Sequence, residues 1–262
     1  MVRMLFGGSA SASGDAASAV ATLRKVAAEG AEAKGVAAEE KDPVTLSAVS
    51  QFKKALTDAK SLDAALGDPR VLKVLLPALG LADQTGNAGL VRKALLADPT
   101  ETDGLLANLG TTWKQAAETL NLREGGLAAL QDASMQATVV KGYVQYQYRQ
   151  GLDETQPGMS DALYFLEQAG SADGVYDILG NTVLRRVVTG ALGLPAQIAI
   201  QPVETQARAI TSRLKLEELQ DPARLRKLAE RYVIAAANDA AAQFSDTPDL
   251  ATLSVQLRSF KA

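Results

Sequence analysis

Apolar residues recur along most of this chain with the spacing of an amphipathic helix. In four segments positions i, i+3, i+4 and i+7 are all apolar, which places the four side chains on one face of a helix. Strand-type alternation is confined to Val144, Tyr146 and Tyr148, which stand within a longer helical pattern. We therefore expect an all-α protein with no sheet. The four faces are Val71/Val74/Leu75/Ala78, Trp113/Ala116/Ala117/Leu120, Leu184/Val187/Val188/Ala191 and Leu225/Leu228/Ala229/Tyr232.

The residues beside these faces are typical of helix ends. Asp68-Pro69 and Asp221-Pro222 each place a side-chain acceptor before a proline, a combination favoured at a helix N-terminus. Asn181 and either Thr111 or Thr112 are expected to cap the other two helices. Three of the helices are followed by a glycine or asparagine between leucines, as a left-handed residue after a helix requires. These three residues are Gly80, Asn121 and Gly193.

Two segments of the chain align with each other without gaps. Residues 66–81 (LGDPRVLKVLLPALGL) and 179–194 (LGNTVLRRVVTGALGL) share Leu, Gly, Val, Ala, Leu, Gly and Leu at equivalent positions. Each is followed by a further helical pattern, which in the second case is Val203/Ala207/Ile210/Leu214, and then by another of the four faces. We expect an internal duplication, with two similar three-helix halves packed into one compact domain.

Breaks in these patterns divide the chain into five parts. The pattern from Asp132 to about Gln150 indicates one long helix, which we expect to be broken afterwards by Gly151 and by Gln156-Pro157-Gly158. The expected parts are a flexible or weakly helical segment at 1–45, a first helical half at 46–125, a connecting helix and loop at 126–160, a second helical half at 161–243, and a tail with a short amphipathic helix at 244–262.

Composition excludes most kinds of enzyme site. The 262 residues include no cysteine and no histidine, which rules out disulfides, thiolate nucleophiles, iron–sulfur clusters, histidine-based triads and the usual zinc sites. Lys+Arg 27 against Asp+Glu 30 gives a formal charge of −3. We therefore expect no nucleic-acid partner and no attraction to an anionic membrane.

The N-terminal region lacks the features of a membrane anchor or a secretory leader. No stretch approaches the roughly 18 apolar residues of a membrane span, and the apolar patch Met4–Phe6 is too short for a Sec signal peptide. Residues 9–35 are rich in Ala, Ser and Gly. Two interpretations stay open for them: a frayed tail followed by a weak helix around 16–29, or a small-residue signal for a non-Sec export pathway. We expect no membrane insertion.

Motifs for phosphate, metal or nucleophile chemistry are absent or incomplete. The chain has no Gly-Lys dipeptide and no GxGxxG. Asp83–Asn87 begins like a calcium loop, but Ala88 and Ala94 stand where such a loop needs Gly and Glu. Two Ser-x-x-Lys matches occur without the partner motifs of the penicillin-recognising enzymes. We therefore predict no catalytic residue, no metal ligand and no cofactor.

Tyrosine is distributed unevenly. Five of the six tyrosines fall between Tyr143 and Tyr176, and tyrosine suits both half-wet cores and partner interfaces. Both interpretations stay open for the candidate partner-binding residues Tyr143, Tyr146 and Tyr148. A second candidate docking element is the amphipathic C-terminal pattern, whose apolar positions are Leu250, Leu253, Leu257 and Phe260.

Three segments carry a resemblance to a known family. They are 160–195 (SDALYFLEQAGSADGVYDILGNTVLRRVVTGALGLP), 78–99 (ALGLADQTGNAGLVRKALLADP) and 221–233 (DPARLRKLAERYV). The chain resembles the alphaproteobacterial domain-of-unknown-function family 1217 over roughly residues 20–240, although the segment around Trp113 departs from the family pattern. The resemblance implies a helical fold without an established enzymatic activity and without catalytic residues to carry over. It also implies a flagellar connection, because the genes of this family commonly lie among flagellar genes.

These observations lead us to expect a non-enzymatic helical protein that binds another protein in bacterial flagellar assembly or export. The expected partners are flagellar rod, hook or export components, and the expected location is the cytoplasm or the flagellum. Within this class two roles stay open: an exported subunit, and a cytoplasmic chaperone or regulator of export. The alternative is a small-molecule-binding protein, or an enzyme that uses carboxylate, lysine or tyrosine chemistry in a pocket of converging ionisable side chains.

Overall fold

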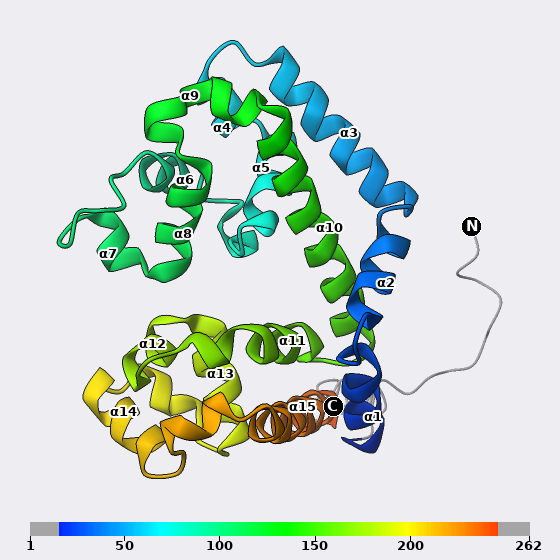
Figure 1. Cartoon of the computed structure of the whole chain (residues 1–262), viewed down its shortest axis with the longest axis vertical. Coiled ribbons are helices and arrows are strands. Elements are labelled where there is room, and N and C mark those ends of the chain that lie inside the picture. Colours follow the sequence, from blue (N-terminus) through cyan, green and yellow to red (C-terminus); the bar gives the residue numbers. More distant parts are fainter. Residues whose placement is uncertain (1–15, 246–262) are drawn as a thin grey trace, which may run out of the picture. The chain divides into compact units, whose positions relative to one another are not determined.

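The computed structural model describes residues 16–245, and within that range every regular element is a helix (Figure 1). The prediction of an all-α protein is thereby confirmed. The described residues form two compact units, and each is treated by itself below. Unit 1 comprises 16–26, 152–175 and 186–245, and unit 2 comprises 27–151 and 176–185.

Unit 2 is built around α3, α5 and α8. Its core contains Phe52, Leu75, Leu120 and Tyr143, all of them at most 1% exposed. Helix α3 packs against α5, and α8 against α6, α7 and α9. The helices of this unit are α2 (Ala31–Glu39), α3 (Pro43–Asp58), α4 (Leu62–Gly67), α5 (Pro69–Ala78), η1 (Ala82–Gln84), α6 (Ala88–Leu95), α7 (Leu105–Leu109), α8 (Thr111–Leu120), α9 (Leu122–Gln131), α10 (Ala133–Thr155) up to Gly151, and α12 (Val175–Gly180) from Tyr176.

Unit 1 is organised by one long helix, α15. It packs against α1, α11 and η4, and Leu23, Phe165 and Val233 are among the side chains buried in this unit. The helices of unit 1 are α1 (Ala16–Val26), α11 (Met159–Gln168), η2 (Ala169–Ser171), α13 (Thr182–Ala191) from Arg186, η3 (Ala196–Ile200), α14 (Val203–Thr211), η4 (Leu216–Gln220) and α15 (Pro222–Ser245).

The four predicted apolar faces are confirmed. All their residues are buried except Ala78, which is half-buried at the last position of α5. The expected long helix exists as α10. The expected break at Gly151 is wrong, because a single glycine is tolerated inside a helix, and α10 continues through it to Thr155. Among residues 16–245, no helix combines the length and the hydropathy that crossing a bilayer requires.

Most of the predicted helix ends are also confirmed. Asp68 Oδ1 accepts from the Arg70 amide at 2.8 Å, and Asn181 Oδ1 accepts from the amides of the two residues that follow Thr182. The expectation of a threonine cap before α8 is wrong. Gly110, with φ 97°, occupies the N-cap of α8 without a side-chain hydrogen bond, because α7 ends immediately before it and Thr111 already lies inside α8.

The predicted left-handed residues have the expected backbone. Gly80, Asn121 and Gly193 have φ of 73°, 42° and 63°. After α5 the Leu81 amide donates to the Leu76 carbonyl, and after α13 the Leu194 amide donates to the Thr189 carbonyl, so both helices end in the same local motif. The similarity of these two segments is local, and the duplication as a whole stays a prediction.

Candidate functional site

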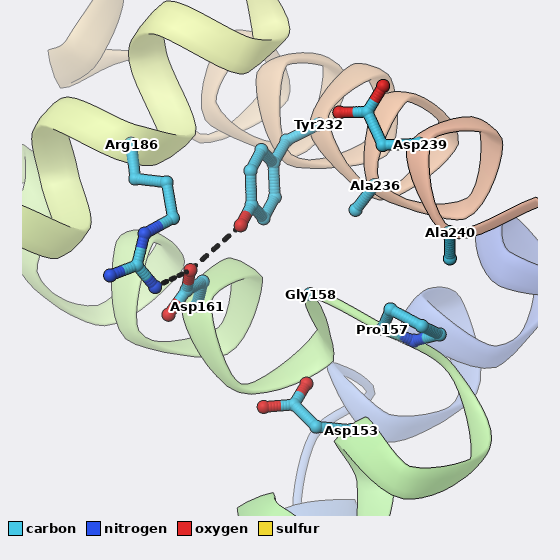
Figure 2. A pocket seen from close by; sticks show the side chains of 9 residues that line it. All are labelled: Asp153, Pro157, Gly158, Asp161, Arg186, Tyr232, Ala236, Asp239 and Ala240. Atoms are coloured by element: carbon cyan, nitrogen blue, oxygen red, sulfur yellow. Dashed lines mark hydrogen bonds and ion pairs between the residues drawn. The ribbon is translucent and has the colours of Figure 1, made fainter. Parts of the chain in front are cut away.

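A pocket of about 470 Å³ lies in unit 1, where the end of α10, the following loop, α11, α13 and α15 meet (Figure 2). Its polar groups are three carboxyls, one guanidinium and one phenol, and its remaining lining is made of small or apolar residues. The lining residues are Asp153, Pro157, Gly158, Asp161, Arg186, Tyr232, Ala236, Asp239 and Ala240.

Two glycines allow Tyr232 to lie where it does. Gly158 follows Pro157 with φ 85°, and a Cβ there would lie 2.9 Å from the Cβ of Ala236 and 3.0 Å from Cε1 of Tyr232. A Cβ at Gly190 would lie 2.9 Å from Cδ2 of the same ring. Because both positions lack a side chain, the ring fits between the two backbone segments.

Asp161 is the centre of the polar network in the pocket. Its Oδ2 accepts from Arg186 Nη1 and from the Tyr232 hydroxyl, each at 2.7 Å (Figure 2). Burial, together with the negative charge of Asp161, raises the pKa of Tyr232. Burial alone would lower the pKa of Arg186, but the attraction of Asp161 outweighs it and the pKa is raised. At neutral pH the tyrosine therefore keeps its proton and the arginine its charge.

Asp153 stands at the other end of the pocket in a different environment. Its Oδ1 accepts from the Ser160 amide at 2.9 Å, so the last turn of α10 is tied to the first turn of α11. Burial raises the pKa of Asp153 to about 6, and repulsion from Asp161 adds to this while the amides of residues 158–160 oppose it. Among residues 16–245, no lysine or arginine forms an ion pair with Asp153. This carboxyl therefore titrates close to neutrality.

The pocket contains a carboxyl with a raised pKa, Asp153, beside the hydrogen-bonded network of Asp161, Arg186 and Tyr232. Within the described part of the chain, no three Asp or Glu side chains are placed to hold a metal ion together. The prediction that the protein has no catalytic residue stays a prediction, as does its alternative, a binding or catalytic pocket. What the geometry establishes is that α11, α13 and α15 are joined at one carboxylate.

The three predicted docking tyrosines lie in unit 2 in different environments. Tyr143 is 1% exposed and belongs to the core, with its hydroxyl accepting from Gln147 Nε2 at 3.0 Å. Tyr146 and Tyr148 are half-buried. A Cβ at Gly35 of α2 would lie only 2.1 Å from Cε2 of Tyr148, so this ring rests directly on α2. Core packing therefore accounts for Tyr143, whereas a partner role for the other two stays a prediction.

The second predicted docking element is the apolar pattern at the C-terminal end of the sequence. Leu250, Leu253, Leu257 and Phe260 lie outside the described residues.

Two exposed apolar side chains in unit 1 were not anticipated. Ile200, the last residue of η3, is 83% exposed, and Val203, the first residue of α14, is 48% exposed. The helical pattern predicted for this segment is found as α14, in which Ala207 and Ile210 are buried and Val203 is not. Val203 directly follows Pro202, one turn before the part of α14 that is packed, so its side chain projects beyond the buried stripe.

Sequence reasoning found none of the pocket. Arg186 and Tyr232 lie 25 and 71 residues from Asp161, and no motif links them. The one usable signal was Pro157-Gly158, which predicted a chain break but not what approaches it.

Comparison with known proteins supports the fold. The family model described as a protein of unknown function (DUF1217) matches residues 78–225, more than half of the chain. The crystal structure of a structural-genomics protein from Agrobacterium tumefaciens is similar, with a TM-score of 0.66 and 23% identity over 83% of this chain and 92% of that chain. At this identity the likeness concerns the fold alone. No functionally curated protein matches the sequence.

Proposed function

Because this chain belongs to the DUF1217 family, whose description assigns no function, we propose a function from its own surface: it is a non-enzymatic helical protein that binds another protein in bacterial flagellar assembly or export. The observation that carries protein binding is the exposed apolar pair, Ile200 and Val203. The flagellar setting is supported by the family resemblance, since genes of such proteins commonly lie among flagellar genes.

The apolar pair has the exposure expected of a docking point. Ile200 is the most exposed large apolar side chain among residues 16–242, and Val203 follows three positions later. Covering an aliphatic side chain of this size completely contributes about 1.5–3 kcal/mol. Exposed apolar patches are a feature of protein interaction sites, so a partner that covers both Ile200 and Val203 would gain binding energy.

The backbone on both sides of Ile200 is fixed by hydrogen bonds from the buried side chain of Gln206. Gln206 is 4% exposed, and its Nε2 donates to the Gln201 carbonyl at 2.7 Å and to the Ala199 carbonyl at 3.3 Å. The residues on both sides of Ile200 are therefore tied to α14. A partner would meet a preformed surface and would not bear the entropy cost of ordering a loop.

The test is a cross-linked pull-down from the flagellated cells in which the protein is native, with partners identified by mass spectrometry. We expect the wild-type chain to recover rod, hook or export-gate proteins. The double variant I200S/V203S should recover them at least about tenfold less, as loss of a central apolar contact implies.

A matched control is available on unit 2. Val44 and Leu46 of α3 are 67% and 52% exposed, and V44S/L46S makes the same chemical change at a distant position in the sequence. This control should bind as the wild type does. If the wild type and both variants all fail to recover flagellar proteins, in an experiment that recovers a known flagellar complex, the proposal is overturned. If the wild type and both variants recover them equally, Ile200 and Val203 are excluded as the docking point.

A further inference from the structure

We propose that unit 1 binds an acidic segment of its protein partner through the basic face of α15, defined as Arg224, Arg226, Lys227 and Arg231. This inference rests on the proposed function and adds the chemistry of the partner.

The basic face points away from the core of unit 1. Arg224, Lys227 and Arg231 follow one another at i, i+3 and i+7, so they form a stripe along the helix. The stripe lies opposite the buried side of α15, to which Leu228 and Ala229 belong. Arg226 lies about 100° round the helix from Lys227, next to the edge of the buried side. All four basic residues are exposed. The charges are therefore available to another molecule.

The residues of the basic face form fewer ion pairs and hydrogen bonds than the other arginines of the described chain. Among residues 16–245, every arginine except Arg226 and Arg231 takes part in a hydrogen bond or an ion pair. Within the same range Lys227 also forms no hydrogen bond and no ion pair. Arg224 forms one ion pair, with Glu218, at 4.0 Å. Glu230, the carboxylate nearest to them along the helix, is engaged by Arg24 at 2.7 Å.

This arrangement fits carboxylates supplied from outside. A guanidinium offers a planar fork of donors that matches a carboxylate, and at Arg226, Lys227 and Arg231 no internal pair among the described residues has to be broken first. An acidic peptide segment that crosses α15 can contact two or more of the four charges. Because the charges are exposed, their contribution will act largely through association rate and will weaken with salt.

The same features disfavour nucleic acid as the partner. The basic face itself holds no aromatic side chain on which a base would stack. Among acidic partners, a protein segment with a few carboxylates therefore suits this surface better than a nucleic acid does.

The experiment measures binding of a fluorescein-labelled octaglutamate peptide to the purified full-length chain by anisotropy, at low and at physiological salt. We expect saturable binding that weakens with salt. R226E/R231E should bind octaglutamate at least about tenfold more weakly than the wild type. R226Q/R231Q, which removes the two charges without reversing them, should lose less affinity. Circular dichroism checks that both variants are folded.

The control is K53E/K54E, which reverses two exposed lysines of α3 in unit 2. It changes the net charge as R226E/R231E does, and it should bind octaglutamate as the wild type does. Equal loss in both charge reversals, absence of saturable binding, or tighter binding of a DNA duplex than of octaglutamate would each overturn the inference. If octaglutamate fails to bind but the pull-down recovers flagellar proteins, this inference falls and the proposed function stands.

Discussion

Tyr232 donates a hydrogen bond of 2.7 Å to Asp161, a residue 71 positions earlier in the chain. The bond joins α15 to α11, and Arg186 of α13 reaches the same oxygen of Asp161. Three helices of unit 1 are thus tied at one atom.

Removal of the Tyr232 hydroxyl should weaken unit 1 without unfolding it. Tyr232→Phe deletes a hydrogen bond to a charged acceptor, and we expect the free energy of unfolding to fall by about 1–2 kcal/mol in urea denaturation. The loss stays moderate because Arg186 remains bound to Asp161. Tyr176, which is 61% exposed, provides the control: Tyr176→Phe should leave the unfolding midpoint unchanged. If Tyr232→Phe lowers the free energy of unfolding no more than Tyr176→Phe does, the hydrogen bond to Asp161 contributes nothing to stability.

Asp153 should make the protein less stable as the pH rises. The pKa of its carboxyl is about 6 in the folded chain against an ordinary value of 3.8, so between these two pH values the folded state binds more protons than the unfolded state. Stability contributed by the protonated carboxyl is therefore present at about pH 4 and is lost once the pH exceeds about 6.

Asp153→Asn removes this titration. Compared with the wild type, the variant should gain stability as the pH rises from 4 to 7, by about 1–2 kcal/mol after allowance for partial exposure. Thermal melts of both proteins across this range provide the measurement, and the difference between the two curves isolates Asp153 from the other carboxyls. A difference that does not change with pH would contradict the elevated pKa.

Gly158 and Gly151 should respond to alanine in opposite directions. At Gly158 a side chain would have to adopt φ 85° and would press on Ala236 and Tyr232, so Gly158→Ala should cost about 1–3 kcal/mol. Gly151 lies inside α10 with nothing within 4 Å of an added Cβ. Gly151→Ala should therefore stabilise the chain by up to about 1 kcal/mol. Urea denaturation of the two variants tests both signs.

The left-handed residues after α8 and α13 provide a fourth test. Asn121 has φ 42° and Gly193 has φ 63°. Asn121→Gly should be neutral or stabilising by a few tenths of a kcal/mol, whereas Gly193→Ala should destabilise by about 1 kcal/mol, because alanine is strained at positive φ. If thermal melts place Gly193→Ala at or above the wild type, the backbone at the end of α13 is not as described.

The parts of the fold that were predictable depend on neighbours in the sequence. The face of Trp113, Ala116 and Leu120 follows from the 3.6-residue period, and Asp68 caps α5 through an amide two residues away. The missing cap before α8 is the instructive exception. Thr111 is a suitable residue, but α7 ends so close to α8 that only Gly110 remains for the N-cap.

The pocket was beyond prediction for the opposite reason. The contact between Asp161 and Tyr232, and the pKa of Asp153, depend on which helices pack together and on how much water they exclude. No local pattern encodes either quantity. Ile200 shows the same limit, since an isoleucine is expected in a core until the packing of its helix is known.

Helix α2 has a consequence for how the protein opens. None of its residues is buried, and it is held largely by polar contacts: Glu32 accepts from Arg149 at 2.8 Å and from Gln145 at 3.0 Å, and Glu39 accepts from Thr45 at 2.6 Å. Apart from the Tyr148 ring, which rests on Gly35, detaching α2 uncovers little apolar surface, so the free energy of this local opening lies well below that of global unfolding. Amide hydrogens of α2 will exchange with solvent ahead of those in α5 or α8, and trypsin will cleave at Lys34 before it cleaves within α5 or α8.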